Sequence, residues 1–439
     1  MCMVRGHTRR LVGVFSGPVL GLIFAVIAGE AMAEDYRQAL EHLLSDHPRI
    51  AAAHADREGA ESSSSRARSA WYPDLSLTTS AGHQRMTYTN GTPYTDLQTR
   101  ELTFGLRQTL WDFGATNGAI DKAEIAVRQF RASEDQVTQD LLLEGLTAYI
   151  NLDRARRSLT FAEQSVANIR TQTGMEESRV EMGGGFTSDV LQAKSQLAGA
   201  EARLARAKGL LANAQNRFRA VFGRDPVDDD PTQRMPVPFD LLPPSLPSAV
   251  EFAYKHNPQL EVLRLTAEGN RTEVDRVRAA ELYPNLHAIA QRKLERNPDG
   301  ITGDRTQEIL KLELTYQFNT GLGSFYAIDA AEKAAVAAED RVKELHDLIQ
   351  EQVSNAWQNL DSARDNAGHL DNQVRIVTEF LHLAREERLQ GRRSLIDVLS
   401  GETSLIDAQS DAASADADVA IAAFTLFRAA GMLDLSLIH

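Results

Sequence analysis

One apolar position recurs every seven residues between residues 183 and 223, and a small or apolar residue follows each of them three places later. Steps of three and four between apolar residues place them along one narrow side of a helix, as in coiled coils. Alanine at nearly half of these positions lets a neighbouring helix approach closely. The repeating positions are Val190, Leu197, Leu204, Leu211 and Phe218, followed by Ala193, Ala200, Ala207, Ala214 and Val221.

The same pattern returns near the C-terminus, where Val398 and Gly401 begin a second run with this spacing. The turns before the two helices align as well. Asp189 and Asp397 occupy equivalent positions in them and are, by subtraction of their residue numbers, 208 residues apart. A long, narrow helix that occurs twice in the same surroundings predicts an internal duplication.

Each half of the chain predicts the same order of elements: helix, strand, strand, long helix, helix. In the strands the period changes to two, with large apolar residues on one face and polar or charged residues on the other. The seams of the long helices are typical of coiled coils or helical barrels rather than of globular helices. We expect strands at about 74–88, 101–112, 285–295 and 308–318, and long helices at about 117–182 and 324–390.

This order divides the chain into a first structural repeat, 34–223, and a second, 248–433. Between them lies a linker rich in proline and aspartate, 224–247, which we interpret as a surface connector. Residues 434–439 form a C-terminal tail.

The first 33 residues have the features of a secretory signal peptide. A basic region precedes the apolar segment 11–28, and Ala31-Met32-Ala33 is a cleavage site of small residues. Cys2, the only cysteine, lies inside this segment, so the mature chain is expected to lack disulfides and a lipid-attachment cysteine. No later stretch is apolar over the length that a transmembrane helix needs.

Composition and motifs weigh against several function classes. A net charge of −14 disfavours nucleic acid as a partner, because binding to phosphates needs a basic face. The histidines have no metal-ligand spacing, and there is no phosphate-binding loop and no nucleophile elbow. We therefore expect no enzymatic activity, no cofactor and no bound metal.

The four strands cannot close a membrane barrel by themselves. An open edge in lipid leaves backbone groups unpaired, and the smallest membrane barrels have about eight strands. We therefore expect strands from several chains to be pooled, and three copies would give a barrel of twelve strands. The alanine-rich helices would continue this barrel as a tube.

With these features, the mature chain resembles the TolC-type outer-membrane factor family. The resemblance rests on the duplicated order, the Tyr-Pro-x-Leu strand entries at Tyr72 and Tyr283, and the Gly-x5-Asp-Val-Leu turns at Gly183 and Gly391. It implies a mainly α fold with a small β part. As a homotrimer this fold forms a twelve-stranded barrel in outer-membrane lipid, continuous with a periplasmic coiled-coil tunnel. Such a duct works with a periplasmic adaptor and an inner-membrane transporter, either ABC-type or proton-driven.

The resemblance also assigns roles to residues of the turns between long and short helices. Asp397 matches an acidic position of the channel entrance, whereas Ser400 stands where a second acidic residue is expected. Arg393 matches a latch residue whose partners would be Ser188 and Asp189, and Arg388 could pair with Asp189. The glycines of the turns, Gly183, Gly184, Gly185 and Gly391, mark the tips where the adaptor would dock. The plainer interpretation, helix caps and turn glycines, is compatible with these roles.

Two classes of function remain open at this point. The first is an exit duct, for which the residues from Glu181 to Lys194 resemble members of the family that serve type I protein secretion of adhesins. The alternative cargo is small toxic molecules from a multidrug efflux pump. The second class is a periplasmic coiled-coil scaffold without a channel, against which the strands with one charged and one apolar face argue.

Overall fold

The computed structural model describes residues 36–87, 94–226, 235–317 and 320–438. Residues 1–33, the predicted signal peptide, therefore lie outside the described residues, and so does Cys2. Within the described residues, no helix has an 18-residue stretch apolar enough to cross a bilayer.

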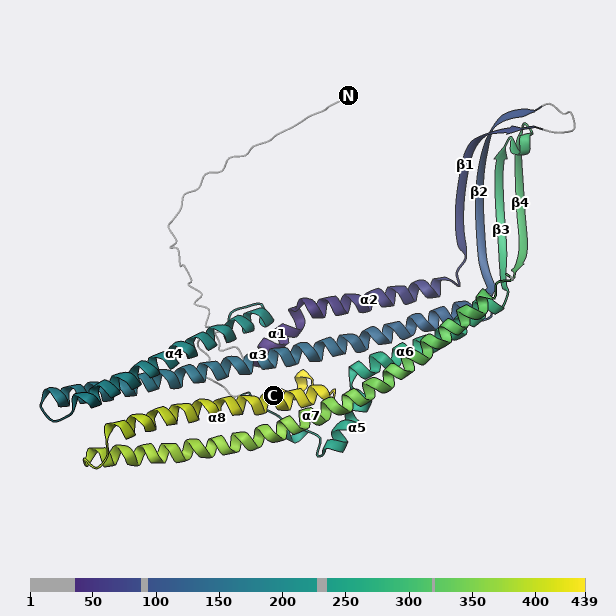
Figure 1. Ribbon diagram of the computed structural model, residues 1–439. Coiled ribbons are helices and arrows are strands. Elements are labelled where there is room, and N and C mark those ends of the chain that lie inside the picture. Colours follow the sequence, from purple (N-terminus) through teal and green to yellow (C-terminus); the bar gives the residue numbers. More distant parts are fainter. Residues whose placement is uncertain (1–35, 88–93, 227–234, 318–319, 439) are drawn as a thin grey trace, which may run out of the picture.

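Two long helical hairpins make up most of the molecule (Figure 1). The first consists of α3 (Ala115–Glu181) and α4 (Thr187–Phe222), and the second of α7 (Gly323–Leu389) and α8 (Leu395–Ala429). A displacement of 208 residues carries α3 onto α7 at both ends, which is the offset between Asp189 and Asp397. The fold therefore contains the predicted duplication.

A pair of shorter helices precedes each two-stranded hairpin. These are α1 (Tyr36–Asp46) and α2 (Pro48–Ser69) in the first repeat, and α5 (Leu246–His256) and α6 (Pro258–Leu282) in the second. Proline begins α2 and α6, where its missing N–H leaves no bond unmade. Asn257 caps α6, because its Oδ1 accepts a hydrogen bond of 2.9 Å from the backbone N–H of Gln259.

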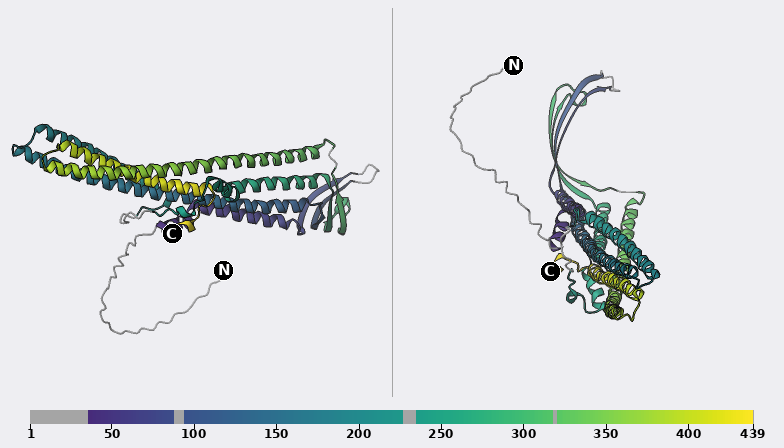
Figure 2. Two further views of the ribbon diagram at one scale, coloured as in Figure 1. Left: turned by 90° about the horizontal axis from the view of Figure 1, so that it is seen from below. Right: turned by 90° about the vertical axis from the view of Figure 1, so that its left-hand side faces the viewer.

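The helices form one curved layer (Figures 1 and 2). Near the strands the neighbours are α2, α3, α6 and α7 in that order, and near the far end they are α4, α3, α8 and α7. Among the described elements, neither α2 nor α4 packs against α7. The layer thus has two free edges, α2 with α4 on one side and α7 on the other.

The four strands form one antiparallel sheet in the order β1-β2-β3-β4. The sheet projects from the end of the helical layer (Figure 1), and β1 and β4 are its open edges. The strands are β1 (Asp74–Met86), β2 (Thr95–Trp111), β3 (Asn285–Arg296) and β4 (Asp304–Thr315).

Two strands differ from the sequence-based prediction at their ends. The first residue of β2 is Thr95 rather than residue 101, and β4 runs over 304–315 rather than 308–318. Residues 95–100 and 304–307 are mostly polar on both faces, so they show no apolar alternation. They are nevertheless paired along the backbone, since Thr95 lies opposite Met86 and Asp304 opposite Arg296.

One face of the sheet exposes large apolar side chains. Leu75 in β1 is 80% exposed, and Leu310 and Leu312 in β4 are 86% and 70% exposed. The adjacent residues in β4, such as Lys311 and Glu313, point to the opposite face because strand residues alternate. This arrangement matches strands with lipid on one side and a polar interior on the other.

The main core lies midway along the helical layer. Leu40, Leu146, Phe424 and Phe427 are completely buried there, and Ile438 of the C-terminal tail joins them. The linker takes part in this core, which corrects its interpretation as a surface connector. Its residues after 234 alternate apolar side chains with proline, and Val237 and Leu242 each pack against two core clusters.

Candidate functional site

The two helical hairpins end side by side at the pole opposite the sheet (Figures 1 and 2). We call this pole the tip. The first tip turn, residues 182–186, connects α3 to α4, and the second tip turn, residues 390–394, connects α7 to α8. All the site residues predicted from the sequence lie in these turns or within the adjoining helical turns.

Glycines terminate the long helices at the tip. Gly183 has φ +80° and Gly391 has φ +70°, a region where a side chain costs about 1–2 kcal/mol. In the first tip turn, the N–H of Gly184 bonds to the carbonyl of Arg179 at 2.9 Å. In the second, the N–H of Arg392 bonds to the carbonyl of Glu387 at 2.9 Å. Both turns thus satisfy carbonyls at the helix ends and reverse the chain tightly.

The acidic residues at the starts of α4 and α8 lie where helix caps are expected. Ser394 caps α8, and its Oγ accepts a hydrogen bond of 3.3 Å from the N–H of Asp397. Asp397 is exposed in the first turn of α8. In α4, the Ser188 hydroxyl donates to Asp189 Oδ1 at 3.4 Å. Both carboxylates lie near the positive end of a helix dipole, which stabilises them.

Arg388 contacts a different acidic residue from the one predicted. Its Nη2 lies 2.6 Å from Oε2 of Glu176 on α3, so within the described protomer the predicted pair with Asp189 is replaced by one with Glu176. Glu176 is 4% exposed, and a Cβ added at Gly185 would lie 3.2 Å from its Oε1. Arg388 also donates to the carbonyl of Arg393 at 3.4 Å. One buried carboxylate therefore connects both tip turns.

Arg393 likewise pairs inside its own helical hairpin rather than with the first tip turn. Its Nε lies 3.1 Å from Glu387 Oε2, and its guanidinium lies 5.1 Å from the ring centroid of Phe380. The predicted partners, Ser188 and Asp189, are not among its contacts in the described protomer. The short turn leaves Arg393 close to the last turns of α7, which explains the local pairing.

A second buried carboxylate joins three helices farther from the tip. Glu402 of α8 is 1% exposed and forms an ion pair with Arg385 of α7. Asn168 of α3 donates its Nδ2 to Glu402 Oε2 at 3.3 Å. Buried charges persist when they are paired and hydrogen-bonded, as this one is.

The sequence reasoning missed both buried carboxylates, although the pattern contains a signal for them. Ala162, Val166 and Ile169 follow the seam of α3, and the same steps of four and three lead on to Thr173 and Glu176. An ionisable residue at a seam position predicts a buried charge that needs a partner. The partner itself, Arg388, lies 212 residues away and cannot be chosen from spacing alone.

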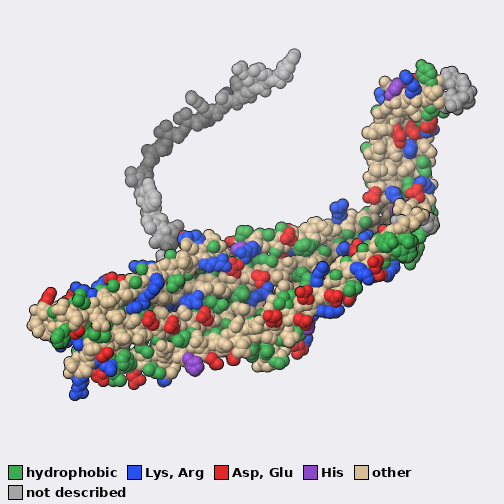
Figure 3. Space-filling model, viewed as in Figure 1, with side chains coloured by type: hydrophobic (Ala, Val, Ile, Leu, Met, Phe, Trp, Pro, Cys, Tyr) green, Lys and Arg blue, Asp and Glu red, His purple; other side chains and the backbone are tan. Residues whose placement is uncertain are grey.

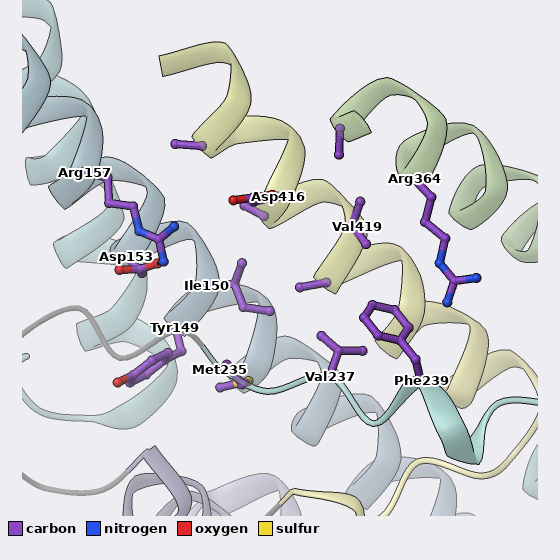
Figure 4. A pocket seen from close by; sticks show the side chains of 14 residues that line it. Tyr149, Ile150, Asp153, Arg157, Met235, Val237, Phe239, Arg364, Asp416 and Val419 are labelled. Carbon is purple, nitrogen blue, oxygen red and sulfur yellow. The ribbon is translucent and has the colours of Figure 1, made fainter. Parts of the chain in front are cut away.

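A cavity of about 350 Å³ lies midway along the molecule, between α3, α8, α7 and the linker. Figure 4 shows Met235, Val237 and Phe239 of the linker facing Ile150 and Val419 across it. The guanidinium of Arg364 lies 4.5 Å from the ring centroid of Phe239. These contacts hold the linker against the helices.

The chemical character of the surface differs between the helical part and its junction with the sheet. Lysines, arginines, aspartates and glutamates are mixed over the helices, and apolar side chains gather where α7 meets the strands (Figure 3). This apolar patch contains Leu322, Phe325 and Tyr326, which are 53%, 63% and 68% exposed. Aromatic side chains at the end of membrane strands are typical of the interface between lipid and water.

The class of protein follows from this geometry: a duplicated helical layer with open edges, continued by a sheet with one apolar face. Comparison with known proteins adds the family. Residues 39–224 match the family "Outer membrane efflux protein". The chain is 24% identical to outer membrane efflux protein BepC of Brucella suis over 344 residues, covering 78% of this chain and 74% of BepC.

Two further similarities span nearly the whole chain. Outer membrane protein TolC of Vibrio cholerae is 24% identical over 431 residues, which is 97% of this chain and 96% of that protein. The crystal structure of the outer membrane protein VceC of Vibrio cholerae superimposes with a TM-score of 0.76 at 18% identity. That superposition covers 90% of this chain and 96% of VceC.

These findings all indicate an outer-membrane factor of the TolC type, an efflux channel of the outer membrane. The resemblance inferred from the sequence is confirmed, and so are the mainly α fold with a small β part and the location in the outer membrane with a periplasmic helical part. The twelve-stranded barrel of three copies stays a prediction.

Proposed function

We propose that three copies of the chain form an exit duct through the outer membrane, which receives cargo from an inner-membrane transporter through a periplasmic adaptor. The observation that carries this proposal is the pair of free edges that run the length of the molecule. α2 leads into β1 and β4 leads into α7, so the open edges of the sheet continue as the open edges of the helical layer.

Closure of these edges requires further copies. Unpaired backbone groups of β1 and β4 in lipid cost several kcal/mol each, so each edge strand needs a partner strand. Four strands from each of three copies give twelve, enough for a barrel with a lumen. A barrel of this kind has a passage and no catalytic step, and we propose that the chain has no enzymatic activity.

The tip is the proposed docking site for the adaptor and the gate of the duct. Met182, Phe186 and Leu389 are 81%, 74% and 89% exposed there, beside the glycines of both turns. Apolar side chains exposed together are typical of surfaces that bind another protein. Asp397, repeated in three copies, would give the entrance an acidic ring, and Arg388 and Arg393, through their pairs with Glu176 and Glu387, would hold the tip turns of each copy in place.

For the cargo, we propose proteins exported by a type I, ABC-driven system. The basis is the likeness of residues 181–194 to secretion members of the family and the lack of a lipid-attachment cysteine after the predicted signal peptide. The second candidate is small molecules from an efflux pump, which the name of BepC as an efflux protein favours.

A cross-linking pull-down of the tagged protein from intact cells tests the proposal. We expect a covalent trimer together with an adaptor and an ABC transporter, and loss of proteins from the cell surface or medium in a deletion strain. Recovery of a proton-driven pump with drug sensitivity would favour the second candidate. A soluble periplasmic monomer without partners would contradict the duct itself.

A further inference from the structure

Toward the end of the sheet farthest from the helices (Figure 1), the apolar face carries two arginines. Residues directly opposite each other in neighbouring antiparallel strands share a face, and so do residues two apart in one strand. Leu102 of β2 lies opposite Leu294 of β3 on the apolar face. Two residues farther along, Arg100 lies opposite Arg296 on the same face, and both side chains are exposed. Two arginines therefore stand side by side where the apolar part of this face ends.

The two arginines form an unfavourable pair. Residues at directly opposite positions have Cβ atoms about 4.5–5.5 Å apart, so like charges there repel each other. Among the described residues, neither Arg100 nor Arg296 takes part in an ion pair, although Asp304 of β4 lies opposite Arg296. Farther along, Arg85 and Asp96 neutralise each other at 2.7 Å. Two arginines against the single carboxylate of Asp304 leave one positive charge without a counterpart.

The adjacent residues on the opposite face form an unfavourable pair that the chain does neutralise. Glu101 of β2 lies opposite Glu295 of β3. The Nζ of Lys293 lies 3.6 Å from Glu101 Oε1, and the Nε of Arg305 lies 2.7 Å from Glu295 Oε2. Each glutamate thus has a basic partner, whereas the two arginines remain available to an anion from outside the chain.

The turn after β3 fixes the position of Arg296 relative to β2. The Nδ2 of Asn297 donates to the backbone carbonyl of Gln98 in β2 at 2.8 Å, and its Oδ1 accepts a hydrogen bond of 3.0 Å from the N–H of Gly303. These bonds connect β2, β3 and the start of β4 beside the arginines. The backbone therefore sets the spacing of the arginines before an anion binds, which lowers the entropic cost of binding.

Two adjoining hollows lie along the apolar face beside and below the arginines. The first, of about 370 Å³, contains Arg100 and Arg296 in its lining, together with Leu102 and Leu294. The second, of about 490 Å³, begins two residues nearer the helices and has a mainly apolar lining on this face, where Arg292 and Glu308 pair with each other at 3.6 Å. Its apolar side chains on this face are those of Leu75, Phe104, Leu106, Ala290 and Leu310. We call these the arginine hollow and the apolar hollow.

The arginines lie at the height where lipid head groups are expected. By subtraction of residue numbers, Leu314 near the helices is ten residues from Asp304, which lies opposite Arg296. Ten residues span about 34 Å along a strand, and a tilt of about 35–45° reduces this to a height of about 24–28 Å. The apolar band of a membrane barrel is about 25 Å tall. In the proposed barrel, the arginines would thus meet the head groups of the leaflet farther from the periplasmic helices.

We propose that Arg100 and Arg296 bind the phosphate of a phosphorylated lipid in the outer leaflet, whose acyl chain lies in the apolar hollow. This inference rests on the barrel proposed above, in which the apolar face points to lipid. Guanidinium groups bind phosphate through two parallel hydrogen bonds, and a phosphate between the two arginines removes their mutual repulsion. A free phosphate has the same charge but cannot fill the apolar hollow, so the adjoining hollows favour the lipid.

Titration of the purified full-length protein with a defined lipid tests this inference. The protein is kept in dodecyl maltoside micelles, and diphosphoryl lipid A, the same lipid with its phosphates removed, or inorganic phosphate is added. Native mass spectrometry counts the bound molecules at each concentration. We expect diphosphoryl lipid A to bind about tenfold or more tightly than its phosphate-free form. Inorganic phosphate should bind more weakly than diphosphoryl lipid A, because it buries no apolar surface.

Matched substitutions locate the binding site. Arg100→Gln combined with Arg296→Gln should weaken binding of diphosphoryl lipid A about tenfold or more. Arg107→Gln combined with Lys311→Gln removes the same charge from the opposite face of the sheet and should change this affinity by less than about twofold. Ala290→Phe fills the apolar hollow without a change of charge, and it should weaken binding of the lipid about threefold or more but leave that of inorganic phosphate unchanged.

Three results would overturn the inference. The first is equal affinity of the native protein for the lipid with and without its phosphates. The second is an equal loss of affinity in the two double variants, which would indicate a general effect of charge. The third is binding of inorganic phosphate as tight as that of the lipid, with no effect of Ala290→Phe, which would make a free anion the ligand.

Assembly and export are followed separately from lipid binding. Heat-sensitive migration on gels reports the trimer, and if the Arg100→Gln, Arg296→Gln protein does not assemble, the two single substitutions decide, each with an expected loss of about threefold or more. A trimer that supports export but binds both forms of the lipid equally would contradict only the lipid site. A chain that forms no trimer would contradict the proposed duct, and lipid binding by its monomer would still decide this inference, because both arginines belong to one copy.

Discussion

Glu176 shows what a single ionisable residue does inside a seam of helices. Its carboxylate is buried and accepts a hydrogen bond from Arg388 at 2.6 Å, and a Cβ added at Gly185 would lie 3.2 Å from its other oxygen. Glu177, the next residue, points outward and pairs with Lys194 in water. The two neighbours thus allow a buried and an exposed ion pair to be compared in one turn of helix.

Replacement of Glu176 by alanine should therefore lower the stability of the tip. Arg388 is only 22% exposed in its side chain and would lose its partner, with a cost of about 1–3 kcal/mol. Glu177→Ala, the matched control, should change stability by about 0–1 kcal/mol, as exposed pairs do. Thermal unfolding in detergent measures both, and limited proteolysis at the tip turns locates the change. Equal effects of the two substitutions would contradict the importance of burial.

Glu273 provides a pH-dependent contact between elements, because it joins α6 to α3. Hydrogen bonds from Arg276, and then from Lys122 of α3, lower the pKa of this carboxyl from 4.5 to about 2. A lowered folded-state pKa means that the contact stabilises the protein above about pH 4.5 and is lost as the pH falls toward 2.

Glu273→Gln should accordingly reduce stability by about 1–3 kcal/mol at pH 7 and by progressively less toward pH 2. Thermal unfolding of the substituted and native proteins across this pH range gives the difference. Asp275→Asn, at a residue that is 79% exposed beside Arg278, should leave the difference near zero throughout. A penalty for Glu273→Gln that persists at pH 2 would rule out the ion pairs as its cause.

The elements differ in how far the sequence predicted them, and the reasons are physical. The long helices were predicted to within two residues at each end because their seams and glycine turns repeat over many turns of helix. The ends of β2 and β4 were wrong because residues 95–100 carry polar side chains on both faces. At the tip, Arg388 and Arg393 were predicted as site residues from the sequence. The pairing of Arg388 with Glu176 was not predicted, since ion pairs between distant helices depend on tertiary geometry.

The linker illustrates the same limit and gives a test at the level of elements. Proline and aspartate indicated a surface connector, yet Leu242 packs against two core clusters while its neighbour Leu241 is 47% exposed. Leu242→Ala should lower stability by about 1–3 kcal/mol, because it removes partly buried methyl groups. Leu241→Ala should have a much smaller effect. Similar unfolding temperatures for the two variants would restore the interpretation of a loose connector.

At the scale of the whole molecule, the sheet makes sense only as part of a larger assembly. Its apolar face is uncovered, its edges are unpaired, and the helical layer below it is open along the same two sides. Three copies would pair β4 of one with β1 of the next and would turn every Leu310 toward lipid and every Lys311 toward the lumen.

A charge placed on either face of β4 tests this orientation. Leu310→Arg should cost about 2–4 kcal/mol for each copy if the side chain meets the middle of the bilayer. Ile309→Arg places the same charge one residue away, on the face shared with Lys311, where water in the lumen can solvate it. We expect Leu310→Arg to abolish the heat-sensitive oligomer in outer-membrane fractions and Ile309→Arg to preserve it. The opposite result would mean that the apolar face of the sheet points inward, and the barrel proposed here would have to be abandoned.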